Sequence, residues 1–396
     1  MTPFEQRWDM YLESLKKADR YRTLTPVRPL GGALIERAGR TLIDFSSNNY
    51  LGLAGHPALI DRATAWTRAW GAGAGASRLV TGTFEIHAAV EQKLAALKRT
   101  DAALIFNSGY QANSSVLPAL FDADILGEAP LVFTDKLVHA SLHHGCRAAG
   151  VREIRFRHND LGHLDSLLKK HQGKAGARFI LTESVFSMDG DRADLAALSD
   201  IAERYGAFLY VDEAHATGVL GPNGMGLSGD VPGKVDLIMG TFSKALGSFG
   251  AYVACSKRLK EMLVNRCGGL IYATALPPGV LGAMDAALDL VPTLDTERAR
   301  LQAAAKRLRT ALRDQGLDTG GSTTQIVPAV IGSEKAALAA ARVLEDAGIL
   351  GIAIRPPTVP SGASRIRLAV TAAHTDAQMN ALCAAVPALA AVKAKR

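Results

Sequence analysis

The chain has 396 residues, a length that predicts two or three structural units. Of these residues 48% are hydrophobic and 21% are charged, a composition typical of globular proteins. Its net charge of +7 is scattered apart from the short run KAKR, which argues against nucleic-acid binding but suits an anionic substrate or a phosphorylated cofactor. No apolar run has the length of a membrane span and the N-terminus lacks the apolar segment of a secretory signal, so we expect no membrane partner.

The cysteine pattern indicates a reducing compartment. Cys146, Cys255, Cys267 and Cys383 are far apart in the sequence and form no CxxC pair. Widely spaced cysteines of this kind are typical of reduced, mostly buried thiols, so we expect a cytoplasmic protein.

The first part of the chain predicts a helix followed by short strands. Apolar residues recur at helical spacing over roughly the first 20 residues, at Phe4, Trp8, Tyr11, Leu12 and Leu15. The segments ALIE and TLIDFSS that follow favour short strands.

From about residue 55 the pattern alternates between helices and buried strands. HPALIDRATAWTRAW and FEIHAAVEQKLAALKR have the spacing of helices. The strand-like apolar runs are DAALIFN, PLVFTD, VREIRF, RFILTES, AFLYVDE, DLIMGTF and AYVACS. This alternation predicts an α/β fold with a mainly parallel seven-stranded sheet that is covered by helices on both faces.

The remainder of the chain predicts a smaller α+β domain. Two prolines in ALPPGVLG mark a break, and a long helix that bends at Pro292 follows. Strands IVPAVIG, GIAIR and RIRLAV then alternate with helices. We therefore expect an N-terminal helix and short strands over 1–54, a large domain over 55–285 and a small C-terminal domain over 286–396.

Polar residues follow the predicted strands at the ends where ligands of parallel sheets bind. The residues that follow successive strands are Ser108-Gly109-Tyr110, His139, Ser187, Asp212 through His215, and Thr241 through Lys244. These side chains are expected to gather at one edge of the sheet.

Three of these residues are ambiguous one at a time. Lys244 is either solvated or a Schiff-base nucleophile, and Asp212 is either a structural carboxylate or the partner of a buried cation. His139 is either a satisfied core histidine or a flat ring stacked on another ring. Asp212 and Lys244 are separated by 32 residues (244 minus 212), about one helix and one strand, so they belong to nearby strand ends. Together with hydroxyl-rich and glycine-rich turns, these residues predict a pyridoxal phosphate (PLP) site.

Competing motifs lack their required context. DEAH occurs without any GxxxxGK[ST] phosphate loop, and GAGAGAS follows a helical segment and has the wrong spacing for a dinucleotide turn. His139 and His143 have the spacing of a metal-binding pair on a helix, but no third ligand accompanies them. We expect no metal.

Ordered motifs over nearly the whole chain resemble the α-oxoamine synthases, a family of fold-type-I PLP enzymes related to aspartate aminotransferase. The matching segments are DFSSNNYLGLAGHP, GASRLVTGT, IHAAVE, FNSGYQAN, DKLVHASL, ESVFSMDGD, VDEAHATGVLG, TFSKALGS, IYATALPP and AIRPPTVPSGASRIRLAVTAAH.

The resemblance implies a role for each matching residue. Lys244 resembles the cofactor-bound lysine, Asp212 the partner of the pyridine nitrogen and His139 the residue stacked on the ring. The other residues implied to bind cofactor are Gly109, Tyr110, Ser187, His215, which also assists catalysis, Thr241, and Thr274 from a second subunit. The residues implied to bind substrate are Arg22, Asn48, Thr358 and Arg367.

The resemblance also implies the reaction, a decarboxylative condensation of an amino acid with an acyl thioester. AIRPPTVPSGASRIRL is most similar to the biotin-pathway branch of the family, which joins L-alanine to a pimeloyl thioester of CoA or of a carrier protein. A glycine C-acetyltransferase or an enzyme with a longer acyl donor is the alternative. A homodimer with the site at the subunit interface is implied as well.

Overall fold

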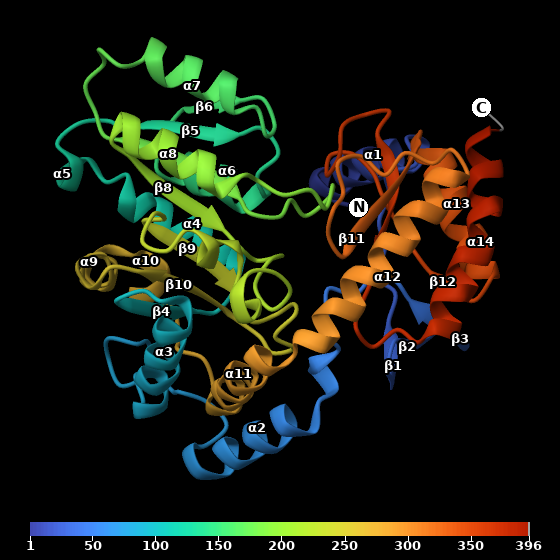
Figure 1. Cartoon of the computed structure of the whole chain (residues 1–396), viewed down its shortest axis with the longest axis horizontal. Helices are drawn as coiled ribbons and strands as arrows, with labels where there is room; N and C mark the ends of the chain where they lie inside the picture. Colours follow the sequence, from blue (N-terminus) through green and yellow to red (C-terminus); the bar gives the residue numbers. More distant parts are fainter. Residues whose placement is uncertain (395–396) are drawn as a thin grey trace. The chain divides into compact units, whose positions relative to one another are not determined.

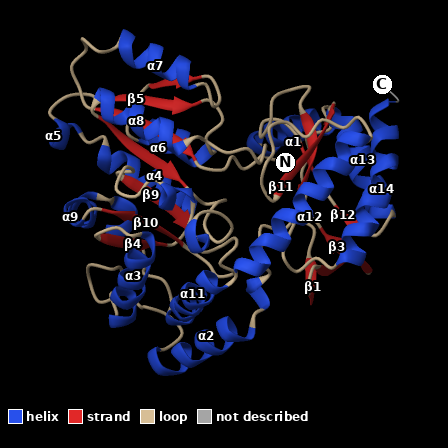
Figure 2. Cartoon of the chain, viewed as in Figure 1, coloured by secondary structure: helices blue, strands red, loops and turns tan. Residues whose placement is uncertain are grey.

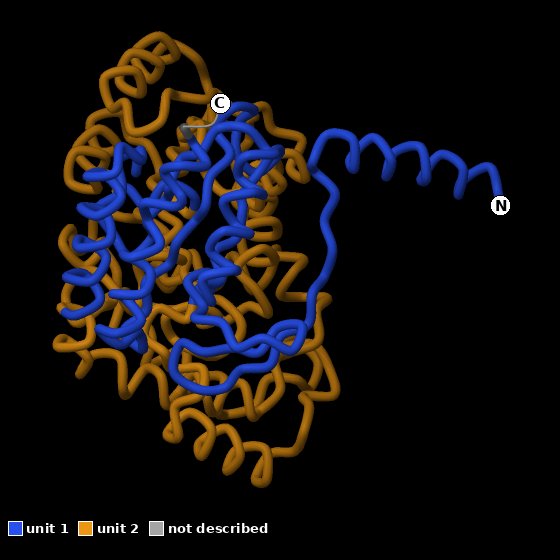
Figure 3. Tube along the Cα trace, turned by 90° about the vertical axis from the view of Figure 1, so that its right-hand side faces the viewer, with its two compact units in different colours: residues 1–48, 188–191, 300–396 blue, residues 49–187, 192–299 orange. Residues whose placement is uncertain are grey.

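The computed structural model describes residues 1–394 and divides into two compact units (Figure 3). Unit 1 contains Met1–Asn48, Met188–Asp191 and Arg300–Arg396, and unit 2 contains Asn49–Ser187 and Arg192–Ala299. The first strands therefore group with the C-terminal part of the chain, whereas the sequence was expected to divide at 54/55 and 285/286. The grouping has a physical cause, since Ile43 and Asp44 pair with Ile349 and Leu350.

Unit 2 is built around one seven-stranded sheet with the order β4-β10-β9-β8-β7-β5-β6 (Figures 1 and 2). Its strands are β4 (Ala102–Phe106), β5 (Leu131–Asp135), β6 (Glu153–Phe156), β7 (Arg178–Glu183), β8 (Ala207–Asp212), β9 (Leu237–Thr241) and β10 (Ala251–Cys255). β10 runs antiparallel to both of its neighbours, and the other pairs are parallel. The predicted mainly parallel seven-stranded sheet is confirmed.

Helices and short helical turns fill the connections of unit 2. They are η1 (Leu53–Gly55), α2 (Pro57–Trp70), α3 (Glu85–Lys98), α4 (Gly109–Leu120), α5 (Ala123–Leu126), α6 (Ala140–Ala148), α7 (Leu161–Lys170), α8 (Leu195–Tyr205), η2 (Pro222–Gly224), η3 (Leu227–Asp230), α9 (Lys257–Arg266), α10 (Gly268–Ile271), α11 (Pro278–Leu290) and η4 (Val291–Thr293). Every residue of β4, β9 and β10 is buried, as expected for a sheet with helices on both faces.

In its described residues, unit 1 contains two smaller sheets and four helices. One sheet has the order β1-β2-β3-β12 and the other β11-β14-β13. The strands are β1 (Val27–Gly31), β2 (Leu34–Arg37), β3 (Arg40–Asp44), β11 (Ile326–Gly332), β12 (Ile349–Leu350), β13 (Ile352–Ile354) and β14 (Ser364–Ala369), and the helices are α1 (Pro3–Lys17), α12 (Asp295–Asp314, which begins in unit 2), α13 (Glu334–Asp346) and α14 (Asp376–Ala394). The long helix predicted to bend at Pro292 is two helices, because the 3-10 turn η4 separates α11 from α12.

A four-residue excursion, Met188–Asp191, carries the chain from unit 2 into unit 1 and back. The Asp189 carboxylate forms an ion pair of 2.6 Å with Arg365 of β14. The Gly190 carbonyl accepts hydrogen bonds from Thr324 Oγ1 at 2.9 Å and from the Thr323 N–H at 3.0 Å. Gly190 has a φ of +68°, and a Cβ there would collide with the Ile326 carbonyl, so glycine is required at this turn.

Within residues 1–394, no helix combines the length and the apolar character that crossing a bilayer requires.

Candidate active site

A cavity of about 230 Å³ lies at the carboxyl ends of the strands of unit 2. The predicted cofactor residues that line it are Gly109, Tyr110, His139, Asp212, His215, Thr241 and Lys244. The structure thus brings together residues that are up to 135 positions apart in the sequence (244 minus 109). The topology does this because parallel strands place their carboxyl ends along one edge.

Lys244 lies in the loop between β9 and β10. The loop is anchored by Phe242, Ala245 and Leu246, which are fully buried. It turns at Gly247, where φ is +66° and a side chain would collide with the main chain at Leu53. Lys244 itself is only half-buried, and its Nζ lies 2.8 Å from His215 Nε2. A rigid apolar loop therefore presents a single amine to the cavity.

His215 links Lys244 to a buried tyrosine. The other nitrogen of its ring, Nδ1, lies 2.7 Å from the Tyr50 hydroxyl, and both residues are buried. When Lys244 donates to Nε2, Nδ1 carries the ring proton and faces the Tyr50 oxygen. Sequence reasoning missed Tyr50, although it lies within the matching segment DFSSNNYLGLAGHP.

Asp212 ends β8 and is 4% exposed. One carboxylate oxygen accepts a hydrogen bond from the Ala214 N–H at 2.9 Å, and the other accepts one from Asn113 Nδ2 at 2.8 Å. The Tyr210 hydroxyl donates to Asn113 Oδ1 at 2.6 Å and so fixes the orientation of the Asn113 amide. Both donors to Asp212 are neutral, which leaves its negative charge available to a cation in the cavity.

His139 is the N-cap of α6, and its Nδ1 lies 3.2 Å from the Ser141 N–H and 2.7 Å from Ser141 Oγ. His139 is exposed to solvent, yet desolvation by the surrounding protein lowers the pKa of its ring. The Asp212 carboxylate acts to raise this pKa, whereas Lys244 and His143 act to lower it further. The imidazole is therefore neutral near pH 7. Asn113 Nδ2 also donates to Ser141 Oγ, at 2.9 Å, so one amide supports both His139 and Asp212.

His143, the possible metal partner of His139, is engaged elsewhere. Its Nδ1 lies 2.6 Å from the Glu153 carboxylate. Among residues 1–394, no group of three or more His, Cys, Asp or Glu side chains is arranged to hold a metal ion.

The groups suited to an anion lie at the N-terminus of α4 and in the β9–β10 loop. Ser108 caps α4 by accepting a hydrogen bond from the Gln111 N–H at 3.1 Å, and Gly109 and Tyr110 form the first turn. The N-terminus of a 12-residue helix favours negative charge. Thr241 Oγ1 lies 2.7 Å from Ser243 Oγ and donates to the Gly250 carbonyl at 2.8 Å.

Two predicted cofactor residues are not part of the cavity lining. Ser187 is the last residue of unit 2 before the excursion. Thr274 lies in a loop that forms a bridge with Ser77, and its carbonyl accepts a hydrogen bond from Asn107 Nδ2 at 3.0 Å.

The predicted substrate residues all belong to unit 1. Arg367 of β14 is buried and donates to Asn48 Oδ1 at 3.1 Å. Arg22 and Thr358 line a separate cavity of about 430 Å³, in which Arg37, Arg342 and Arg355 also take part. Glu345 also lines the cavity and forms an ion pair of 3.5 Å with Arg37, so the other three arginines leave an excess of positive charge that suits an anionic group.

Glu183 lines the cofactor cavity but was missed by sequence reasoning. It ends β7, pairs in register with Asp212 and is 2% exposed. Burial, followed by the neighbouring Asp212 carboxylate, raises its pKa well above the usual range. The only signal in the sequence was its place at the start of ESVFSMDGD, directly after an apolar run.

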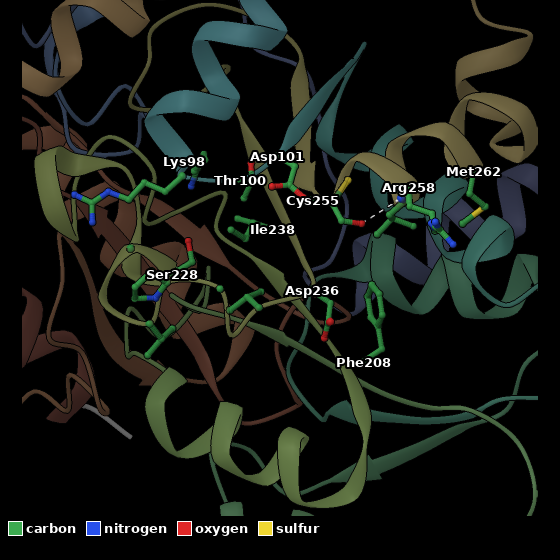
Figure 4. A pocket seen from close by; sticks show the side chains of 18 residues that line it. Lys98, Thr100, Asp101, Phe208, Ser228, Asp236, Ile238, Cys255, Arg258 and Met262 are labelled. Atoms are coloured by element: carbon green, nitrogen blue, oxygen red, sulfur yellow. Dashed lines mark hydrogen bonds between the residues drawn. The ribbon is translucent and has the colours of Figure 1, made fainter.

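A second cavity of unit 2, of about 510 Å³, lies at the opposite ends of the same strands (Figure 4). Phe208, Asp236 and Cys255 line it, together with Lys98. Lys98 Nζ forms a buried ion pair of 2.7 Å with Glu213, the residue that follows Asp212. Glu213 also accepts hydrogen bonds from the Ser228 N–H and hydroxyl, each at 2.8 Å. These contacts hold Glu213 in place and so fix the main chain that directly follows Asp212.

The sheet order and the lysine-bearing cavity at its carboxyl edge define a transferase of the fold-type-I class. The pattern of the family described as aminotransferase class I and II matches residues 40–386, and the chain belongs to this family.

Similar proteins agree with the predicted α-oxoamine synthase group. The chain is 64% identical over 350 residues to a putative 8-amino-7-oxononanoate synthase of Bordetella pertussis, with 88% of each chain covered. It is 58% identical over 388 residues to the 8-amino-7-oxononanoate synthase of Gluconacetobacter diazotrophicus, with 98% of this chain and 97% of the relative covered. A solved structure of SPT with PLP is similar over 100% of both chains, with a TM-score of 0.91 and 29% identity. The predicted family is confirmed.

Proposed function

We propose that this chain is a PLP-dependent acyltransferase that condenses L-alanine with a pimeloyl thioester and releases CO₂. The product is 8-amino-7-oxononanoate, an intermediate of biotin biosynthesis, and the free thiol of CoA or of a carrier protein leaves. The observation that carries the proposal is the cavity in which the Lys244 amine, the buried Asp212 carboxylate and the neutral His139 ring meet. The names of the relatives at 58% and 64% identity give the product, 8-amino-7-oxononanoate, and the family resemblance of the sequence motifs implies the substrates.

The chemistry of the donor set fits PLP. Lys244 supplies an amine for the aldehyde, and the Asp212 carboxylate, whose donors Asn113 and the Ala214 N–H are neutral, suits a protonated pyridine nitrogen. The N-terminus of α4 and the Thr241 and Ser243 hydroxyls suit a phosphate. When bound, PLP withdraws electrons from the bonds at Cα of the amino acid.

The residues of the cavity then move and hold protons. Lys244 Nζ takes the Cα proton of the amino acid, and His215, hydrogen-bonded to that nitrogen at 2.8 Å, buffers its charge together with Tyr50. Neutral His139 donates a hydrogen bond to the thioester carbonyl while Nδ1 is held by Ser141.

Unit 1 supplies the substrate-binding residues in this proposal. Arg367, oriented by Asn48, binds the carboxylate of alanine. Arg22 and Thr358 bind the acyl substrate, whose terminal carboxylate matches the positive charge of the arginine-lined cavity.

We also propose a cytoplasmic homodimer, in which Thr274 and Ser187 complete the cofactor site. The exposed side chain of Thr274 supports a role toward a second subunit. All four cysteines are free thiols, and three of them are buried, which supports a reducing compartment.

The experiment that tests the function is a thiol-release assay with the purified protein. Alanine, glycine and serine are each combined with acetyl, pimeloyl and palmitoyl thioesters, and release is compared with that of Lys244→Ala. We expect the alanine–pimeloyl pair to give the highest kcat/KM, and Lys244→Ala to lose both turnover and the Schiff-base absorbance of bound PLP. Preference for glycine with acetyl-CoA, or for palmitoyl-CoA, would identify another branch of the family. A Lys244→Ala variant that retains absorbance and turnover would refute the site.

A further inference from the structure

The carboxyl groups of Glu183 and Asp212 lie side by side at the carboxyl edge of the sheet. The two residues are register partners in the parallel pair of β7 and β8. Neighbouring strands are about 4.8 Å apart, and register partners point to the same face of a sheet. With exposures of 2% and 4%, both groups are removed from water. Two buried carboxyl groups this close do not both ionise, so one of them holds a proton.

The hydrogen-bond donors around the pair determine which group is ionised. Both oxygens of Asp212 accept hydrogen bonds, from Asn113 Nδ2 and from the Ala214 N–H. In contrast, Glu183 Oε1 is buried and has no hydrogen-bond partner within residues 1–394. Donors stabilise an ionised carboxylate, so Asp212 keeps the charge and Glu183 keeps the proton.

The other charged and titratable groups facing Glu183 do not reverse this assignment. Lys244 favours an ionised Glu183, whereas Asp135 of β5 opposes it, and the neutral ring of His139 adds no charge. Burial and Asp212 outweigh Lys244, because the net effect raises the pKa of Glu183 well above its usual range.

Glu183 also joins β7 to the start of α6. The main-chain N–H of His139 faces its carboxyl group. His139 is the N-cap of α6, so this contact and the Ser141 contacts hold the residue from two sides. Removing the Glu183 carboxyl group would free the main chain at His139 while leaving Ser141 in place.

We propose that Glu183 is a positioning residue of this centre: as a neutral acid it fixes the main chain at His139 and leaves Asp212 as the single carboxylate available to the cofactor nitrogen. The role toward the cofactor nitrogen rests on the proposed function. The protonation of Glu183 does not, because it is a property of the chain without cofactor and can be measured in the apo-protein.

The first test is infrared difference spectroscopy of the apo-protein near neutral pH, comparing wild type with Glu183→Gln. The substitution is expected to remove the carbonyl stretch of a protonated carboxylic acid. Glu153→Gln is the matched control. Burial opposes ionisation of Glu153, but hydrogen bonds from His143 and Arg155 overcome it and lower the pKa of Glu153 to about 2. This control should leave the band unchanged. If Glu183→Gln leaves the band unchanged as well, Glu183 is ionised and the proposal is wrong.

The second test separates the neutral acid from a charged one in the holoenzyme. Glu183→Gln keeps a neutral acceptor for the His139 N–H, so the dissociation constant for PLP and its Schiff-base absorbance should stay at the wild-type values. Glu183→Ala frees His139 and is expected to lower kcat/KM by about 100-fold, the effect of a misplaced reacting group. Thermal unfolding of both variants monitors the fold. Equal losses in the two variants would contradict a neutral positioning role. The infrared result does not depend on turnover of a thioester. Failure of the proposed function can therefore be told apart from failure of the proposal for Glu183.

Discussion

Asn113 contacts three parts of the candidate site with one amide group. Its Nδ2 donates to Asp212 and to Ser141, and its Oδ1 accepts from Tyr210. Asn113 itself is fully buried. Loss of this side chain would therefore disturb the ionised carboxylate and the support of His139 together.

Asn113→Ala is expected to raise the dissociation constant for PLP about ten- to 100-fold. The physical reason is that a hydrogen bond to a charged group contributes about 1.5–3 kcal/mol, and Asp212 loses one. Equilibrium titration of the apo-protein, followed by Schiff-base absorbance, measures this constant. Asn265→Ala, at an exposed position of α9, is the matched control, and an Asn113→Ala constant equal to that of the control would exclude a supporting role.

A residue-scale effect of pH is expected in unit 1. His374 is buried, stacks on Phe45 with ring centroids 3.9 Å apart, accepts a hydrogen bond from the Thr371 N–H and lies 3.1 Å from the Asp44 carbonyl. Burial lowers its pKa to about 4, whereas the unfolded chain titrates near 6.5. Between these values only the unfolded state binds the proton, so the free energy of unfolding falls as the pH is lowered from 6.5 to 4.

The linkage amounts to about 1.4 kcal/mol per pH unit and roughly 3 kcal/mol over the whole window. His374→Gln should reduce this slope by one proton when urea unfolding is measured between pH 7 and pH 4. His87, whose pKa burial also lowers to about 4, keeps its own contribution in that variant. An unchanged slope would show that His374 is not held neutral.

At the scale of the elements, the turn after β8 depends on a buried ion pair with the end of α3. The side chains of Lys98 and Glu213 are 1% and 0% exposed, and Lys98 Nζ also donates to the Met225 carbonyl at 2.5 Å. Removing one member of such a pair leaves an uncompensated buried charge, which costs more than removing both.

Lys98→Met is expected to lower the free energy of unfolding by about 3–5 kcal/mol. The double variant Lys98→Met/Glu213→Gln should lose less than the single variant, because no buried charge is left. Urea unfolding of the two proteins measures both values. A single variant more stable than the double would contradict this account.

The hydrophobic patterns of the sequence predicted most of the strands and helices. They did not predict which strands are neighbours in the sheet. Continuous apolar runs such as β4 and β10 are unmistakable as buried strands, yet nothing in them states that β10 lies between β4 and β9. A signal for its direction was available. Only nine residues separate Thr241 from Ala251 (242 to 250), fewer than a parallel crossover requires, so an antiparallel return follows from loop length.

At the scale of the whole molecule, the difference between local sequence pattern and contacts among distant segments also explains which site residues were predicted. Lys244, Asp212 and His139 are each ambiguous alone, but their residue types and their places at the ends of predicted strands together indicate a PLP site. Glu183, Asn113 and Tyr50 matter through their neighbours, and those neighbours are fixed by register and packing across distant segments. The excursion at Met188–Asp191 was likewise hidden, because its anchors, Arg365 and Thr324, lie far along the chain.

The parallel pair of β3 and β12 has a consequence for biosynthesis. Ile43 leaves the ribosome 306 residues before its partner Ile349 (349 minus 43), an interval of roughly 15–60 s at about 5–20 residues per second. During that time β3 is the edge strand of its sheet, and its Leu42, together with Ile35 of β2, lacks the contact with Leu350 of β12. Every strand of the large sheet, through Cys255, is synthesised within the same interval. The nascent protein can therefore complete its large sheet first, and its earliest strands wait for the last quarter of the chain.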